Sequence, residues 1–76
     1  MPVFDFRRFL ADHFRTPASL QALVAAYGYA APKLSTVRKW WSRGSIPADA
    51  FPVLLVIAEL EAGETVDLMR YTQRRE

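Results

Sequence analysis

The sequence has no cysteine, one histidine and three glycines in 76 residues. Without cysteine there is neither a disulfide framework nor a thiolate metal site, which fits a reducing compartment. The single histidine, His13, is therefore expected to be a surface or half-buried side chain and not a metal ligand. Stability must come from apolar residues, which make up 51% of the chain and include two Trp and five Phe. This composition argues against disorder and predicts one small domain over residues 1–76.

Long apolar runs are also missing. The longest, residues 50–58, is about half of the length that a membrane span requires. Residues 1–14 carry two Asp and two Arg among their apolar side chains, so they lack the uncharged centre of a signal peptide. We therefore expect no membrane segment, no targeting segment and a cytoplasmic location.

Acidic residues are absent from the middle of the chain. Between Asp12 and Asp49 there are five basic residues and no acid, whereas from Asp49 to Met69 there are five acids and no basic residue. The basic residues are Arg15, Lys33, Arg38, Lys39 and Arg43. The net charge of +2 hides this division, which predicts two faces with different partners unless the segregation is accidental.

Helical periodicity and capping residues predict an all-α bundle of four to five short helices, with no strand. The expected helices cover about 5–15, 17–27, 33–43 and 49–62, with a short fifth helix from Thr65 to about residue 72. Residues 73–76 are expected to fray. The expected capping positions are Asp5, Thr16 and Asp49 at N-termini and Gly28, Gly44 and Gly63 after C-termini.

Apolar spacing also indicates which side chains form the core. Phe4 and Phe9 flank Asp5 at the two positions of a hydrophobic staple. In the helix over 33–43, a helical projection centred on Val37 places Trp41 near the inward centre and Trp40 on its flank. Both tryptophans are therefore expected to be core residues. The residues expected to close the core near the C-terminus are Val66, Leu68 and Met69.

The outward face of the helix over 33–43 is basic and short-polar, with no acid. Short side chains allow a helix to approach the major groove closely, Ser can bond base edges, and Lys or Arg can reach guanine acceptors or phosphates. The residues expected to read bases are Ser35, Arg38, Lys39 and Ser42. Those expected to contact the DNA backbone are Arg15, Thr16, Ser19, Lys33, Thr36 and Arg43, because the N-terminus of the helix that Thr16 caps should offer free N–H groups to phosphate.

Four segments in order resemble a known family: Leu-Val-Ala-Ala-Tyr-Gly at 23–28, Ser-Thr-Val-Arg-Lys-Trp at 35–40, Arg-Gly-Ser-Ile-Pro at 43–47, and residues 61–68. Together they look like the phage Cro and repressor type of helix-turn-helix domain, also called lambda-repressor-like. The resemblance covers most of residues 16–68 and implies a motif at about 17–43. Leu20 stands where the family commonly has Gln, so no Gln–phosphate contact is carried over.

The prediction is a sequence-specific transcriptional regulator of phage or mobile-element type that binds double-stranded DNA through residues 33–43. A single module of this size binds DNA weakly. We therefore expect a homodimer on an inverted repeat. No cofactor, metal or small-molecule substrate is expected. An enzyme is not expected either, because no serine has an obvious base and no Gly-rich phosphate loop is present.

Two alternatives use the same scaffold. A protein-interaction module, such as an antitoxin or anti-repressor, would bind its partner through the acidic half and the apolar helix over 49–62. An excisionase-like architectural protein would also have an Arg-Gly-Ile-Pro-like element, as at 43–47, but should continue into a β-hairpin wing. Residues 48–63 indicate a helix there instead.

Overall fold

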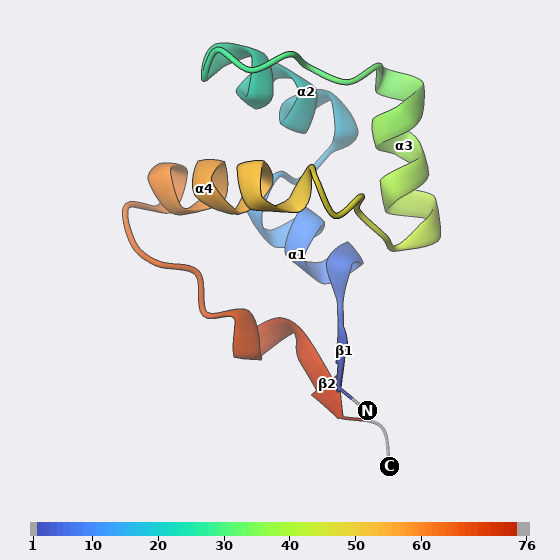
Figure 1. Cartoon of the computed structure of the whole chain (residues 1–76), viewed down its shortest axis with the longest axis vertical. Coiled ribbons are helices and arrows are strands. Elements are labelled where there is room, and N and C mark those ends of the chain that lie inside the picture. The colour runs from blue at the N-terminus through green and yellow to red at the C-terminus, as the bar shows by residue number, and fades with distance from the viewer. Residues whose placement is uncertain (1, 75–76) are drawn as a thin grey trace.

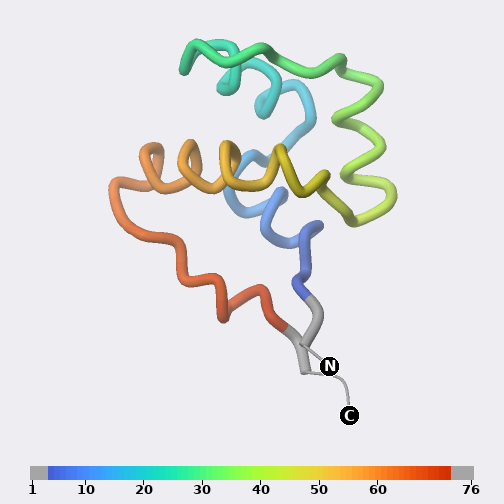
Figure 2. The backbone as a smooth tube through the Cα atoms, in the orientation of Figure 1, coloured from blue at the N-terminus to red at the C-terminus, as the bar shows by residue number. Residues whose placement is uncertain are grey.

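The computed structural model describes residues 2–74 and confirms the predicted all-α fold class (Figures 1 and 2). Its elements are β1 (Pro2–Phe4), α1 (Phe6–His13), α2 (Pro17–Ala26), α3 (Leu34–Arg43), α4 (Phe51–Ala62), the 3-10 helix η1 (Leu68–Tyr71) and β2 (Thr72–Arg74). In Figure 1, α1 lies beneath α4, α2 covers the other side of α4, and α3 stands at one end. Within residues 2–74 no helix combines the length and apolarity needed to cross a bilayer.

The two ends of the described chain form a short antiparallel ribbon that the sequence analysis did not predict. β1 pairs with β2 in the register Pro2↔Arg74, Val3↔Gln73 and Phe4↔Thr72. Three-residue strands without a repeated apolar alternation leave no recognisable pattern, and the pairing joins segments about as distant in sequence as this chain allows. Residues 73–74, expected to fray, are therefore paired, whereas residues 75–76 lie outside the described chain.

The predicted capping chemistry of α1 and α2 is confirmed. Asp5 Oδ1 accepts a hydrogen bond of 3.1 Å from the Arg8 backbone N–H, and the Phe4 and Phe9 ring centroids lie 5.9 Å apart, as a hydrophobic staple requires. At α2, Thr16 Oγ1 accepts from the Ser19 backbone N–H at 3.2 Å. Local side-chain chemistry thus determines where both helices begin.

The predicted cap of α4 is wrong. Ala50, not Asp49, occupies the N-cap position and gives no side-chain hydrogen bond. The backbone N–H groups of Ala50 and Phe51 both donate to Pro47 O, at 3.0 and 3.1 Å. A turn of the backbone therefore satisfies the start of the helix, and the Asp49 side chain stays exposed outside it.

The predicted fifth helix is also wrong in its start and its type. Only Leu68–Tyr71 is helical, as a single 3-10 turn, and Asp67 Oδ1 caps it by accepting from the Met69 backbone N–H at 3.1 Å. The turn buries Tyr71, which is 3% exposed, while Met69 is 74% exposed. Of the three residues expected to close the core, only Val66 packs against it. The apolar spacing of an α-helix, 3.6 residues per turn, does not describe one 3-10 turn. The expectation that Leu68 and Met69 face the core was therefore wrong.

An aromatic cluster forms the lower half of the core. Phe9 is fully buried, and its ring lies 5.4 Å from that of Phe51, 6.1 Å from that of Phe14 and 5.7 Å from that of Tyr71, measured between centroids. Edge-to-face contacts of this kind add to the stabilisation that burial itself provides. This cluster joins α1 to α4 and to the C-terminal segment.

His13 lies at the edge of this cluster, half-buried as predicted. Tyr71 Oη donates to Asp12 Oδ2 at 2.9 Å and lies 3.1 Å from His13 Nε2. Because the single hydroxyl proton goes to Asp12, the contact requires the imidazole Nε2–H as donor. Burial and the bond to Asp12 raise the pKa of Tyr71. Burial lowers the pKa of His13 below its ordinary value of 6.5; Asp12 opposes this shift and Arg70 adds to it.

Stability should therefore fall as the solution is acidified past neutrality. Because the pKa of His13 is lower in the folded state, the unfolded chain takes up the proton first. The contribution of neutral His13 to the free energy of unfolding is complete above the ordinary pKa of 6.5. It is lost as the pH falls through the lower pKa of His13 in the folded state. We expect urea unfolding between about pH 7 and pH 5 to show a smaller pH dependence in His13→Gln, which retains an N–H donor but does not titrate. Equal pH dependence in the two proteins would refute this assignment.

Candidate nucleic-acid interface

The outward face of α3 carries all four predicted base-reading residues. Ser35, Arg38, Lys39 and Ser42 are all exposed, and the helix contains no acid. Within residues 2–74, the Arg38 and Lys39 side chains form neither an ion pair nor a hydrogen bond, while Ser42 Oγ donates to Lys39 O at 3.3 Å. The cationic groups of this face are therefore available to an external ligand.

The inward face of α3 is centred on Val37 and Trp40, which are 0% and 8% exposed. Trp41 is only half-buried, so the predicted order of the two tryptophans is reversed. Trp40 belongs to the same buried cluster as Val24 of α2 and Leu54 of α4. Packing against both of these helices rotates the inward centre away from Trp41, which a projection of one isolated helix cannot show.

Arg7 of α1 fixes the C-terminal end of α3, and the sequence analysis did not identify it. Its Nε donates to Trp41 O at 3.1 Å and its Nη2 to Ser42 O at 2.5 Å. A cation bonded to the last carbonyls of a helix also interacts favourably with the helix dipole. The sequence gives no indication of this contact, because Arg7 belongs to another helix and precedes Trp41 by 34 positions.

Gly44 ends α3 in the left-handed conformation, at φ +66°. A Cβ there would lie 3.0 Å from Arg7 Nε and 3.1 Å from its Cγ, whereas Gly63, at φ +73°, has nothing within 4 Å. Both Gly→Ala variants should lose about 1–2 kcal/mol of stability from backbone strain. Gly44→Ala should lose about 0.5–1.5 kcal/mol more, because the displaced Arg7 side chain weakens its hydrogen bonds to the α3 carbonyls.

Urea unfolding of both variants, alone and combined with Arg7→Ala, separates the two contributions. The excess cost of Gly44→Ala over Gly63→Ala should disappear in the Arg7→Ala background, because no side chain is then crowded. An excess that persists without Arg7 would contradict this account of the α1–α3 contact.

A second contact that the sequence did not reveal holds the segment before α3. Gln21 Nε2, on α2, donates to Pro32 O at 3.1 Å. The connection between α2 and α3, residues 27–33, is long, and this bond restrains it immediately before the first turn of α3. α3 is thus fixed at its start by Gln21 and at its end by Arg7.

The N-terminus of α2 offers less to a phosphate than predicted. Pro17 has no N–H, Ser19 N donates to Thr16 Oγ1, and Leu20 N donates to Thr16 O. Thr16 Oγ1 also donates to Ser19 Oγ at 3.0 Å. Within residues 2–74 this leaves one unpaired N–H in the first turn, that of Ala18, where several were expected.

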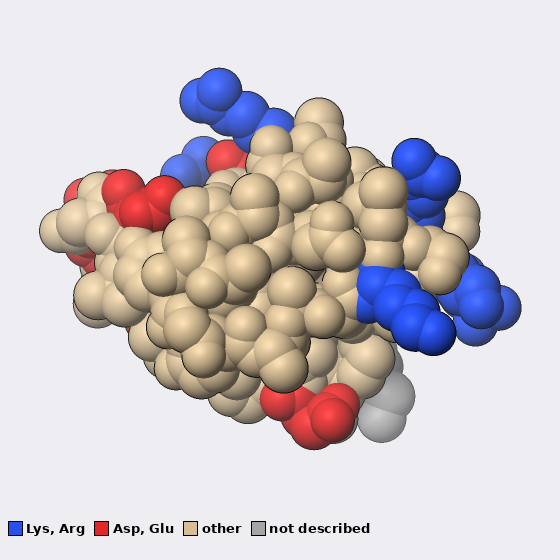
Figure 3. All heavy atoms as spheres, turned by 90° about the horizontal axis from the view of Figure 1, so that it is seen from above, with Lys and Arg blue, Asp and Glu red and all other residues tan. Residues whose placement is uncertain are grey.

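The predicted backbone-contact residues are all exposed: Arg15, Thr16, Ser19, Lys33, Thr36 and Arg43. Arg15 has a left-handed backbone, at φ +65°, between α1 and α2. In Figure 3 basic atoms gather at the end of the molecule where α3 lies, and most acidic atoms lie at the opposite end, where α4 ends. Further basic atoms lie beside the acidic end, and an acidic group lies between the two ends, so the α3 end is the predominantly basic one.

Two of the five acids between Asp49 and Met69, here called the acidic block, have a structural role. Glu59 Oε2 accepts from the Val66 backbone N–H at 2.9 Å, and Glu61 Oε2 accepts from Tyr27 Oη at 2.7 Å. The second bond joins the ends of α2 and α4 and is the main reason that the pKa of Tyr27 is raised. These two carboxylates are partly engaged in holding the fold.

Within the described residues, no group of three or more His, Asp or Glu side chains could hold a metal ion. No protein-family model matches the chain, and neither a curated protein nor a solved structure shows significant similarity to it. The resemblance to the phage Cro and repressor family therefore rests on the residues quoted from the sequence.

Proposed function

We propose that the chain is a helix-turn-helix protein that binds double-stranded DNA and regulates transcription, with α3 in the major groove. One observation carries the proposal: the exposed face of α3 combines free cations with small hydroxyl side chains and lacks any acid. Arg38 and Lys39 would contact bases together with Ser35 and Ser42. A cytoplasmic location and a phage or mobile-element origin belong to the same proposal.

The way in which α3 is held supports this role. Val37 and Trp40 bury its inner face, and Gln21 and Arg7 restrain its two ends. A helix fixed in this manner presents its outer side chains to the groove without a further ordering cost. In Figure 1, α3 stands across the end of α2, so a duplex against α3 could also meet the α2 N-terminus.

Backbone contacts would come from the exposed residues around α3. Lys33 and Arg43 lie at its two ends, and Arg15 precedes α2. Phosphate contacts of this kind fix the register of a protein on DNA without reading its sequence. Ser19 and Thr36 supply hydroxyl donors nearby, whereas the Thr16 hydroxyl would have to give up its bond to Ser19 Oγ in order to donate.

A homodimer is part of the proposal, because two half-sites give the affinity that one small module lacks. The second copy would cover the apolar side chains that α4 leaves exposed, Val56 at 46% and Leu60 at 59%. An excisionase-like protein is disfavoured, because α3 is followed by α4 and not by a β-hairpin.

Fluorescence anisotropy with labelled duplexes at several salt concentrations tests the proposal. The duplexes are the DNA upstream of the gene and an unrelated sequence of equal length. We expect tighter binding to the first, with log affinity falling against log salt by about 0.9 for each phosphate contact. Contacts from Arg15, Lys33 and Arg43 alone predict a slope of about −2.7 per protomer. The absence of binding to either duplex at low salt would refute the proposal and favour a protein-interaction module.

A further inference from the structure

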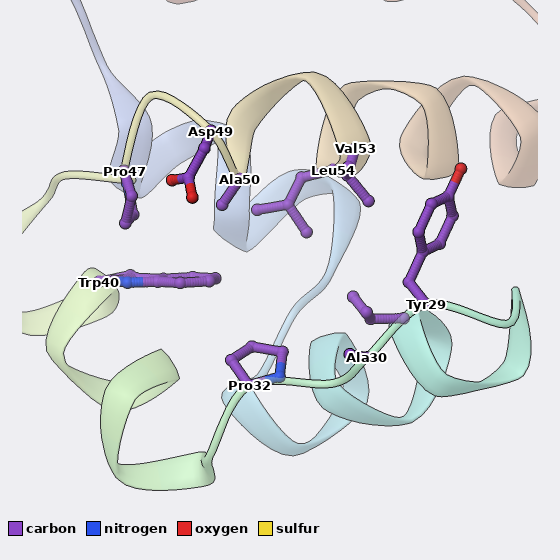
Figure 4. Close-up of a pocket in the computed structure, with 10 residues that line it drawn as sticks. Tyr29, Ala30, Pro32, Trp40, Pro47, Asp49, Ala50, Val53 and Leu54 are labelled. Atoms are coloured by element: carbon purple, nitrogen blue, oxygen red, sulfur yellow. The ribbon is translucent and has the colours of Figure 1, made fainter.

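A cavity of about 340 Å³ opens between the segment before α3, the inner side of α3 and the start of α4. Its volume lies at the lower end of the range for small-molecule pockets. Figure 4 shows its walls: Tyr29 and Pro32 from the segment before α3, Trp40 from α3, and Val53 and Leu54 from α4. The walls are mostly apolar and include two aromatic rings.

One charged group in these walls, the Asp49 carboxylate, forms no ion pair or hydrogen bond within residues 2–74. Figure 4 shows its carboxylate pointing from the start of α4 toward the side on which the Trp40 ring lies. Trp40 is 8% exposed, and because no buried side-chain nitrogen or oxygen lacks a partner in this part of the chain, its indole N–H is within reach of solvent.

We propose that this cavity binds a small aromatic cation, with its charged group paired to Asp49 and its ring against Trp40. An unpaired carboxylate selects a cation and repels an anion. The apolar walls, which include Pro32 and the accessible part of the Trp40 indole, favour a flat ring, and a cation close to an indole gains further attraction from the π system. An amidinium or ammonium group would supply the N–H donors that the carboxylate accepts.

The cavity lies behind α3, on the side away from its exposed cations. Trp40 faces inward, while Lys39 and Ser42 face solvent. The site therefore does not overlap the proposed DNA interface, and the inference does not depend on the proposed function. Its test needs no DNA, so the failure of one proposal is distinguishable from the failure of the other.

Benzamidine is a suitable probe, with benzamide as a neutral analogue of the same shape and benzoate as an anionic one. The readout is the ¹H–¹⁵N NMR spectrum of the full chain, in which the Trp40 indole signal is resolved from that of Trp41. Benzamidine should give a saturable shift of the Trp40 indole and of the amides at 49–54. Binding should weaken about twofold to fivefold in Asp49→Asn, as for the loss of a surface ion pair. The control Glu64→Gln, which removes an exposed acid elsewhere, should bind normally.

Three outcomes would overturn the inference. One is no shift at millimolar benzamidine. Another is equal affinity for benzamidine and benzamide, or equal affinity in Asp49→Asn, which would show that the carboxylate selects nothing. The third is a shift of the same signals on dilution of the protein alone, without a response to benzamidine, which would identify a second copy of the chain as the occupant.

Discussion

Replacing Phe9 by Ala should lower the free energy of unfolding by about 3–5 kcal/mol, the range for removing a buried aromatic ring. Phe9 is fully buried and its ring contacts the rings of Phe4, Phe14, Phe51 and Tyr71. It therefore joins β1, α1, α4 and η1. A domain of this length has a total stability of only about 4–11 kcal/mol. At the lower end of this range the variant would be partly or wholly unfolded at ambient temperature, and at the upper end it would stay folded with a reduced unfolding midpoint.

Circular dichroism at 222 nm during urea and thermal unfolding measures this loss. Met69→Ala is the matched control, since it shortens an apolar side chain that is 74% exposed on η1. The control should change stability by no more than about 0.5 kcal/mol. Similar losses in the two variants would show that Phe9 is not at the centre of the core.

Replacing either Arg38 or Lys39 by Ala should weaken binding to the preferred duplex by about fivefold to 150-fold. This range corresponds to the 1–3 kcal/mol that a contact to a base edge contributes. Both residues are exposed on α3 and form no ion pair within residues 2–74, so their removal should leave the fold intact. Anisotropy titration at constant salt measures the effect, and circular dichroism confirms the fold.

Arg70→Ala is the matched control, because it removes the same charge from an exposed position on η1, which Figure 1 places away from α3. It should change affinity by less than about threefold, in line with a distant surface charge screened by salt. If Arg70→Ala weakens binding as much as Lys39→Ala, net charge and not the α3 face governs association. A loss that is the same for preferred and unrelated duplexes would assign Lys39 to phosphate and not to bases.

The helix boundaries could be predicted from the sequence where local chemistry determines them. Asp5 and Thr16 begin helices by bonding backbone N–H groups three residues away, and Gly44 and Gly63 end helices by adopting positive φ. These effects involve residues a few positions apart, so they are visible in a linear sequence. The outward face of α3 was predictable for the same reason, because helical periodicity alone separates Lys39 from Val37.

Contacts between elements could not be predicted in this way. Arg7 bonds the end of α3, and Tyr71 reaches Asp12 across 59 positions. Neither contact has a pattern in the sequence, since each depends on how the helices pack. The burial of Trp40 in preference to Trp41 has the same origin. Tertiary packing determined these details, and it also created the cavity.

The most direct test of the central claim is an NMR titration of the ¹⁵N-labelled chain with its preferred duplex. The proposed function predicts that the largest amide shifts fall on α3 and on the first turn of α2, around Lys39 and Ala18. The end of α4 and η1, which carry the acidic block, should shift little. If the largest shifts instead fell around Glu61 and Glu64 while the amides of α3 did not shift, the claim that α3 binds DNA would be contradicted.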